Sequence, residues 1–123
     1  MDLALTEEQR QLRDTVREFA ENEILPHVKQ WDEESRFPRE LIARLGELGV
    51  LGIVFPESLG GAGLGHVELT LAVQELAAVD ASIALTVSAH STLCTGHIFQ
   101  SGTEAQRQKY LPELATGRKL GCW

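Results

Sequence analysis

Apolar residues recur at helical spacing through most of the chain, in five stretches separated by turn residues. The first stretch keeps four of them on one stripe among charged side chains: Leu12, Val16, Phe19 and Ile24. Thr6 followed by Gln9 is the signature of a capping box at the start of this stretch. The pattern predicts a helix from Thr6 to Pro26, where proline ends or kinks it, and then a frayed, charged turn over 27–36.

The second and third helices differ in how many of their faces are apolar. Pro38 begins the second helix, because proline is tolerated at the first helical position, and Gly49 ends it. An apolar run over 50–55 and a glycine-rich loop over 60–65 come next. Between 66 and 79 apolar residues occupy nearly every face, which predicts a central helix covered on several sides.

The fourth helix, over 81–101, begins after the capping residue Asp80 and carries small hydroxyl residues through its middle. They are Ser82, Thr86, Ser88, Ser91, Thr92 and Thr95. Either these hydroxyls bond to the carbonyl one turn back and bend the helix, or they leave space for a ligand groove. A second capping box, Thr103 with Gln106, begins a fifth helix that closes at Gly117.

The hydrophobic period changes after the fifth helix. Leu120 to Trp123 forms an apolar run that is typical of a strand, and a lone strand cannot satisfy its backbone donors and acceptors. We therefore expect an all-α, five-helix bundle over 1–117, with 118–123 as the start of a β domain. On this interpretation the chain is the front part of a larger protein.

Composition narrows the class of protein. The chain has 123 residues, 43% of them hydrophobic and 24% charged, and a net charge of -7 without a cluster of Lys or Arg, which argues against nucleic-acid binding. Cys94 and Cys122 match no paired-thiol spacing, so a reducing, cytoplasmic location is expected. Neither a leader segment nor an apolar run long enough to span a membrane is apparent.

Most of the candidate chemistry is weak on spacing alone. The glycines over 60–65 fit neither the dinucleotide fingerprint nor a P-loop. His90 and His97 stand seven residues apart on one predicted helix, about 10 Å by helical rise, which argues against a shared metal ion. Ser88 and His90 point to different faces, so they do not pair as nucleophile and base. No catalytic or metal-binding residue is predicted.

A groove beside the fourth helix is the remaining candidate. Four residues at helical spacing would line it: Leu85, Thr86, Ala89 and Leu93.

Three motifs in order give the chain a family resemblance. They are Leu5-Thr6-Glu7-Glu8-Gln9, then Phe55-Pro56-Glu57-Ser58-Leu59-Gly60-Gly61-Ala62-Gly63, then Gly102-Thr103-Glu104-Ala105-Gln106 leading to Lys109-Tyr110-Leu111-Pro112. Together they resemble the N-terminal helical domain of the acyl-CoA dehydrogenases. The resemblance spans essentially the whole chain.

The resemblance implies an FAD-dependent oxidoreductase of fatty acid metabolism that removes hydrogens from the α and β carbons of an acyl-CoA thioester. It implies a homotetramer or other homo-oligomer, an electron-transfer flavoprotein as acceptor, and a catalytic glutamate outside this chain. Trp123 matches an aromatic position ahead of the flavin-contacting turn, so it is the predicted cofactor-binding residue.

The predicted substrate-binding residues, again by resemblance, are Leu85, Thr86, Ala89, His90 and Leu93. Ser88 to Leu93 looks most like the short-chain branch of the family. Two alternatives stay open: a stand-alone helical interaction module without catalysis, and a related flavoprotein monooxygenase or nitroalkane oxidase.

Overall fold

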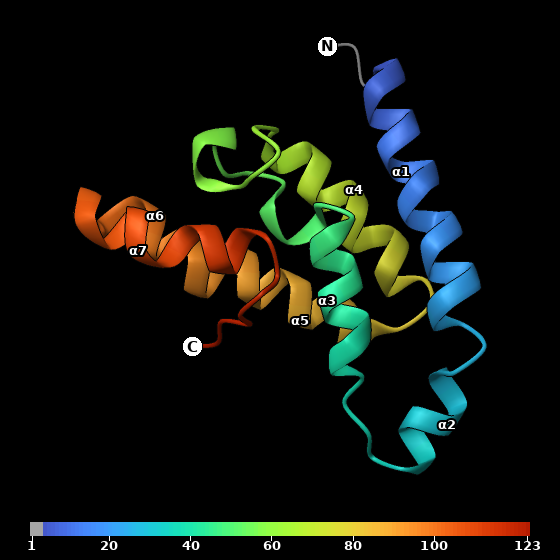
Figure 1. Ribbon diagram of the computed structural model, residues 1–123. Coiled ribbons are helices and arrows are strands. Elements are labelled where there is room, and N and C mark those ends of the chain that lie inside the picture. Colours follow the sequence, from blue (N-terminus) through green and yellow to red (C-terminus); the bar gives the residue numbers. More distant parts are fainter. Residues whose placement is uncertain (1–3) are drawn as a thin grey trace.

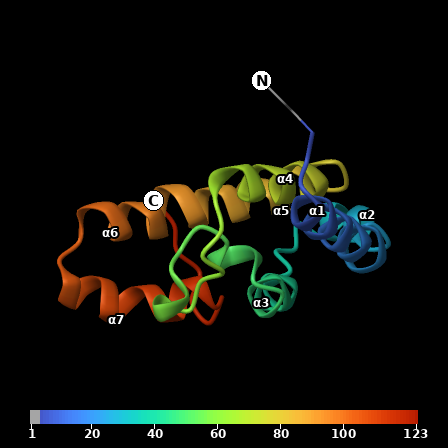
Figure 2. The same cartoon turned by 90° about the horizontal axis from the view of Figure 1, so that it is seen from above.

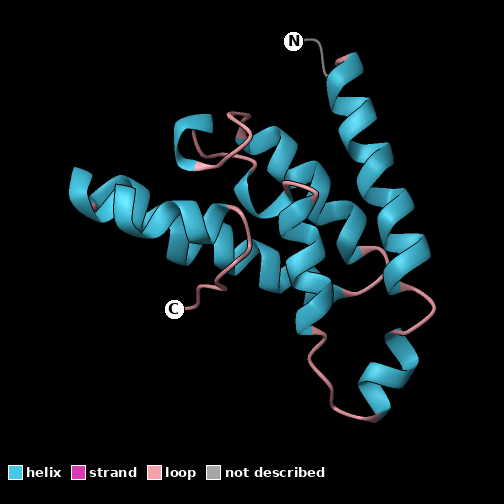
Figure 3. Cartoon of the chain, in the orientation of Figure 1, coloured by secondary structure: helices cyan, strands magenta, loops and turns pink. Residues whose placement is uncertain are grey.

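A computed structural model describes residues 4–123, and every regular element within them is helical (Figures 1 and 3). This confirms the all-α prediction. The elements are α1 (Glu7–Phe19), the π-helical η1 (Ala20–Ile24), α2 (Val28–Glu33), α3 (Arg39–Glu47), the 3-10 turns η2 (Val50–Gly52) and η3 (Glu57–Leu59), α4 (His66–Ala77), α5 (Ala81–Ser88), the π-helical η4 (Ala89–Thr95), α6 (Gly96–Ser101) and α7 (Glu104–Ala115).

Local signals in the sequence set the starts of α1, α5 and α7. Thr6 and Thr103 each accept from the backbone three residues on, and both capping boxes are complete. Asp80 caps α5 by accepting from the amides of Ser82 and Ile83. Capping residues bond to amides two or three residues further along the chain, so these helix starts can be predicted without knowledge of tertiary contacts.

One expectation needs correction. The turn expected over 27–36 contains a helix, α2, because Trp31 buries its ring against the core and is 9% exposed. Residues 120–123 have no regular secondary structure, and Gly121 lies against Cys94 and Leu114. The assignment of 118–123 to a β domain stays a prediction.

The helices lie in two layers. Figure 2 shows α4, α5 and α6 in one layer and α3 and α7 in the other, with α1 and α2 at one end. The main core between them is aliphatic and includes Ile24, Leu45, Leu51, Leu76 and Ile83, each at most 1% exposed. A smaller cluster joins α7 to the segment around η3: Phe55, Leu59, Leu111 and Ala115. The long central helix predicted over 66–79 is α4, and it packs on both α1 and α5.

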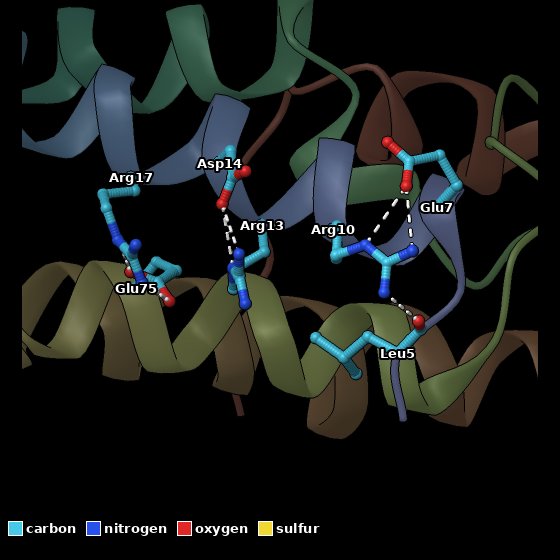
Figure 4. A network of polar contacts seen from close by, with 7 residues as sticks. All are labelled: Leu5, Glu7, Arg10, Arg13, Asp14, Arg17 and Glu75. Carbon is cyan, nitrogen blue, oxygen red and sulfur yellow. Dashed lines mark hydrogen bonds and ion pairs between the residues drawn. The ribbon is translucent and has the colours of Figure 1, made fainter. Parts of the chain in front are cut away.

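Polar contacts between α1 and α4 lie outside this core (Figure 4). Arg17 on α1 donates through Nε and Nη2 to the Glu75 carboxylate on α4, each at 2.8 Å. Arg10 and Arg13 bond within their own segment, to Glu7 and Asp14. Exposed ion pairs add little to stability, so apolar burial holds α1 on α4.

The main chain of α3 touches the main chain beyond α7. A Cβ atom on Gly46 would stand 2.5 Å from the Thr116 carbonyl oxygen and 2.7 Å from the Gly117 Cα, too close for any side chain. Gly117 has a φ of 75°, which glycine adopts without strain. This contact fixes the point at which the chain turns from α7 into residues 118–123.

Candidate functional site

The helical run through α5, η4 and α6 differs from the other helices in charge. Between Ala81 and Gly102 the sequence has no Asp, Glu, Lys or Arg. Outward-facing positions of a surface helix are usually charged, because charged side chains keep their hydration there. A run of this length without charges indicates that its outer face contacts apolar or uncharged groups.

Some of the hydroxyl groups on this run donate hydrogen bonds to carbonyl groups of the same helix. Thr86 donates to the Ser82 carbonyl at 2.9 Å, and Thr92 donates to the Ser88 carbonyl at 2.7 Å. This confirms the bonding pattern in which a hydroxyl satisfies itself one turn back. The same stretch departs from α geometry at η4, where the Gly96 amide bonds to the Ser91 carbonyl five residues earlier.

Four of the predicted substrate-binding residues share one accessible stretch of the run. Leu85 is 68% exposed and Leu93 is 51% exposed, while Thr86 and Ala89 are half-buried between them. Leu85, Ala89 and Leu93 follow one another at four-residue spacing, the spacing of neighbours on a helix surface. We refer to Leu85 and Thr86 of α5 together with Ala89 and Leu93 of η4 as the α5 face. It offers two large apolar side chains and no charge.

His90 does not belong to the α5 face. Its side chain is 0% exposed, and both ring nitrogens have partners on the opposite side. Nε2 lies 3.0 Å from the Leu114 carbonyl oxygen on α7, and Nδ1 lies 2.9 Å from the Gly121 amide nitrogen. Burial lowers the pKa of His90, against a smaller raising effect of the Leu114 carbonyl. The ring is therefore neutral at pH 7.

Trp123, the predicted cofactor-binding residue, lines a hollow next to η4, α6 and α7. Its side chain is 83% exposed, and its ring centroid is 5.0 Å from that of His97. The hollow has a volume of about 400 Å³ and is lined by Cys94, His97, Ile98, Ser101, Gly102, Gln106, Tyr110, Cys122 and Trp123. Burial raises the pKa of the Cys94 thiol, so this group stays protonated.

Sequence reasoning missed the helix side of this hollow. Cys94, His97, Ile98 and Ser101 recur at spacings of three and four, which places them on one face of a helix. That spacing was visible in the sequence. The partners across the hollow, on α7 and in 119–123, depend on tertiary packing and gave no signal.

The glycine-rich loop has no amides free for a phosphate group. The six N–H groups of 60–65 all donate within the chain, five to backbone carbonyls and that of Gly65 to the Glu68 carboxylate. The carbonyl acceptors belong to Glu57, Pro56, Gly52, Phe55 and Ile53. A cradle for phosphate needs unpaired amides that point at the ligand. The loop is therefore a folded connection between η3 and α4.

Residues 4–123 contain no group of three or more His, Cys, Asp or Glu side chains that could hold a metal ion. Within the same residues no helix has the length and apolar character needed to cross a membrane.

Comparison with known proteins identifies the family to which the chain is similar. The family described as "Acyl-CoA dehydrogenase, N-terminal domain" matches residues 6–118. The chain is 45% identical over its whole length to the short-chain specific acyl-CoA dehydrogenase of Clostridium acetobutylicum, of which it covers 32%. It thus spans about a third of the length of this relative.

Solved structures show the same relationship. A chain in the structure of the electron transferring flavoprotein of Acidaminococcus fermentans has a TM-score of 0.95 and 44% identity, and the match covers 98% of this chain and 32% of that one. Butyryl-CoA dehydrogenase from Megasphaera elsdenii has a TM-score of 0.93 and 40% identity, again over 98% of this chain and 32% of the other.

Proposed function

Because the chain belongs to the acyl-CoA dehydrogenase family and corresponds to the N-terminal domain of its members, we propose that it forms one wall of the substrate pocket in a dehydrogenase of short-chain acyl-CoA thioesters. The observation that carries this proposal is the α5 face. Two exposed leucines on a helical run without charges fit an acyl chain and fit a solvated surface poorly.

On this proposal, the chain binds the acyl group, and the rest of such an enzyme supplies the catalytic base. The α5 face can bind an acyl chain and exclude water from it, but it carries no group that could take a proton. Thr86, the polar member of the face, already donates its hydroxyl proton to the Ser82 carbonyl. The base that removes the α proton would come from outside residues 1–123, as the family resemblance implies.

A short acyl chain is favoured by the relatives. The similar proteins include one named as short-chain specific and one named as butyryl-CoA dehydrogenase. Ala89 lies in the middle of the α5 face, and its single methyl group sets the depth of the wall there. A pocket wall with one small residue between two leucines would suit a chain of a few carbons.

FAD is the cofactor we propose for the complete enzyme, where it would accept the hydride from the β carbon. The described residues fit only one edge of such a group. Trp123 offers an exposed aromatic face, whereas the glycine-rich loop has no unpaired amide for a pyrophosphate. We therefore propose that this chain contacts FAD through 118–123, as the start of a β domain, and that most of the cofactor site lies elsewhere.

Two experiments test this division. FAD added to the 123-residue chain should give no stable yellow complex; tight binding with a shifted flavin spectrum would show that the chain holds the cofactor by itself. In a dehydrogenase that contains this chain, turnover should be highest with butyryl-CoA, lower with octanoyl-CoA and lowest with palmitoyl-CoA. A preference for palmitoyl-CoA would exclude the short-chain proposal.

A substitution on the α5 face sharpens the second experiment. Leu85→Glu places a charge where the acyl chain would lie, and we expect the KM for butyryl-CoA to rise by about tenfold or more. Val67→Glu on α4 is the matched control, because Val67 is also exposed, at 55%, but lies outside the face. Equal KM values for the two variants would show that Leu85 does not line the substrate pocket.

Partners and location complete the proposal. An electron-transfer flavoprotein as acceptor is supported by the match to a chain in the Acidaminococcus structure. A homotetramer or other homo-oligomer follows from the family resemblance alone. A cytoplasmic location is supported by the two unpaired thiols, Cys94 and Cys122.

A further inference from the structure

His90 is bonded on both sides of its ring to main-chain groups that are far apart in sequence. The Gly121 amide can only donate, so Nδ1, which faces it at 2.9 Å, must be unprotonated. The ring proton of the neutral imidazole therefore sits on Nε2, which donates to the Leu114 carbonyl at 3.0 Å. The hydrogen bonds thus assign one tautomer.

The segment that His90 holds leads to Trp123. Lys119 anchors its beginning, since its amide donates to the Glu113 carbonyl at 2.9 Å and its Nζ pairs with the Glu113 carboxylate at 2.6 Å. Gly121 then lies flat on Cys94: a Cβ atom on Gly121 would be 2.3 Å from the Cys94 sulfur. Trp123 is only two residues beyond the amide that His90 binds.

We propose that His90 is a positioning residue, which holds the main chain at Gly121 against η4 through Nδ1 and thereby fixes the place of Trp123. The further link, from Trp123 to the edge of FAD, rests on the proposed function. The positioning itself does not depend on any cofactor. His90 acts from inside the bundle, one residue away from Ala89 on the α5 face, so the same turn of helix would orient both the acyl wall and the flavin-side segment.

Imidazole chemistry explains why a histidine stands here. A neutral imidazole offers an acceptor and a donor on opposite edges of one flat ring. An amide side chain reproduces only one of these positions at a time, since the oxygen of Asn replaces Nδ1 and the NH₂ of Gln replaces Nε2. A protonated imidazole has two donors and would lose the Gly121 amide. The site is thus built for the neutral form.

Two variants separate the two hydrogen bonds. His90→Asn keeps an acceptor near Gly121 and loses the donor to Leu114, whereas His90→Gln keeps the donor and loses the acceptor. In ¹⁵N-labelled chain, we expect the Gly121 amide of His90→Gln to exchange with solvent about tenfold faster than in the wild type. The indole N–H of Trp123 should also gain fast motion, seen as a lower heteronuclear NOE.

His90→Asn should keep both signals near their wild-type values. Equal exchange and equal Trp123 motion in the two variants would overturn the proposal, because a side chain that only fills space is removed in both. If neither variant folds, the wild type still decides: long-range ¹H–¹⁵N spectra must show the proton on Nε2 and an unprotonated Nδ1. The opposite tautomer would overturn the proposal directly.

A separate readout tests the link to the flavin. In a dehydrogenase that contains this chain, His90→Gln should shift the flavin absorption spectrum and leave the KM for acyl-CoA within about twofold of the wild type. If Trp123 becomes mobile in the 123-residue chain but the flavin spectrum of the enzyme is unchanged, the positioning stands and the proposed role of Trp123 at the cofactor is wrong. Failure of the two ideas is thus distinguishable.

Discussion

The two π-helical segments share a backbone distortion, but they bury opposite kinds of side chain. In η1 the buried residues are Ala20 and Ile24, and the Leu25 amide closes the wide turn on the Ala20 carbonyl. In η4 the buried residues are His90, Ser91 and Thr95, which are the buried polar residues among those that the structure describes.

The difference teaches that one distortion serves two purposes. At η1 a proline follows at position 26, and the wide turn ends a helix whose apolar stripe is already complete. At η4 the helix continues into α6, so the wide turn is not a terminus. It is occupied by a polar cluster instead, and π-bulges inside helices are frequent at functional positions.

The sharpest test of this comparison is to remove apolar volume from the first segment. Ile24→Ala should lower the free energy of unfolding by about 2–5 kcal/mol, because it leaves a cavity in a fully buried position. Urea unfolding followed by circular dichroism measures this loss. The Gly121 amide should exchange as in the wild type, because its hydrogen bond is to His90 Nδ1 in η4 and not to a residue of η1.

The exposed neighbour provides the control for that experiment. Leu25 is 56% exposed, and Leu25→Ala should change the free energy of unfolding by no more than about 0.5 kcal/mol. A loss below about 1 kcal/mol for Ile24→Ala would mean that η1 is not an apolar anchor.

A hydroxyl deletion in the second segment should have a smaller effect. Thr95 Oγ1 lies 3.5 Å from His90 Nε2, and Thr95→Val removes the hydroxyl with little change of shape. We expect a loss of about 0.5–1.5 kcal/mol in the same unfolding assay. Thr92→Val, in which an exposed hydroxyl is removed, serves as the control and should cost less. A larger loss for Thr92→Val than for Thr95→Val would show that the buried polar cluster does not stabilise the fold.

The ion pair beside the first segment should matter less again. Arg17→Ala removes two hydrogen bonds to Glu75, yet the Arg17 side chain is 48% exposed, so the pair competes with water and salt. The urea midpoint should fall by less than it does for Thr95→Val. The remaining difference should vanish at high salt; a larger, salt-independent loss would contradict the view that apolar burial holds α1 on α4.

The smallest change that we expect is in the dependence of stability on pH, since it involves fractional proton uptake by one group. Burial lowers the pKa of His90 below its usual 6.5, so the unfolded chain binds more protons just below that pH. This contribution to stability is complete above pH 6.5 and is lost as the pH falls toward the folded pKa.

The window for this measurement is above pH 5. Hydrogen bonds from Gln9 and from main-chain amides lower the pKa of Glu68 below 4.5, so its contribution is lost only at more acidic pH. His90→Gln should remove the slope between pH 5 and 6.5. Persistence of the full slope in that variant would assign it to other histidines.

Helix positions were predictable from the sequence where a local signal acts alone. Thr6, Asp80 and Thr103 cap helices through their own side chains, and Gly49 has the left-handed φ of 84° expected of a residue after a helix. The helix α2 was missed because it is six residues long and only Val28 and Trp31 in it are apolar, which is too few to show a helical period.

The candidate site was predictable only as far as it lies on one helix. The common face of Leu85, Ala89 and Leu93 follows from spacing, and the structure places all three together. His90 was grouped with them in the sequence, but it stands three residues after Val87 and seven after Ile83, on the buried side of the run. Helical spacing thus indicates the side that His90 faces, whereas its bonding partners at Leu114 and Gly121 depend on tertiary packing that no local pattern reveals.

The main-chain contact between Gly46 and Gly117 has a consequence for the order of assembly. Residues so distant in sequence meet late, because a long loop must close before the contact gains anything. Gly46 is synthesised well before Gly117, so this contact closes only when nearly the whole chain is available. A bulky residue at either glycine would push the turn at Thr116 and Gly117 away from α3, even with each helix intact.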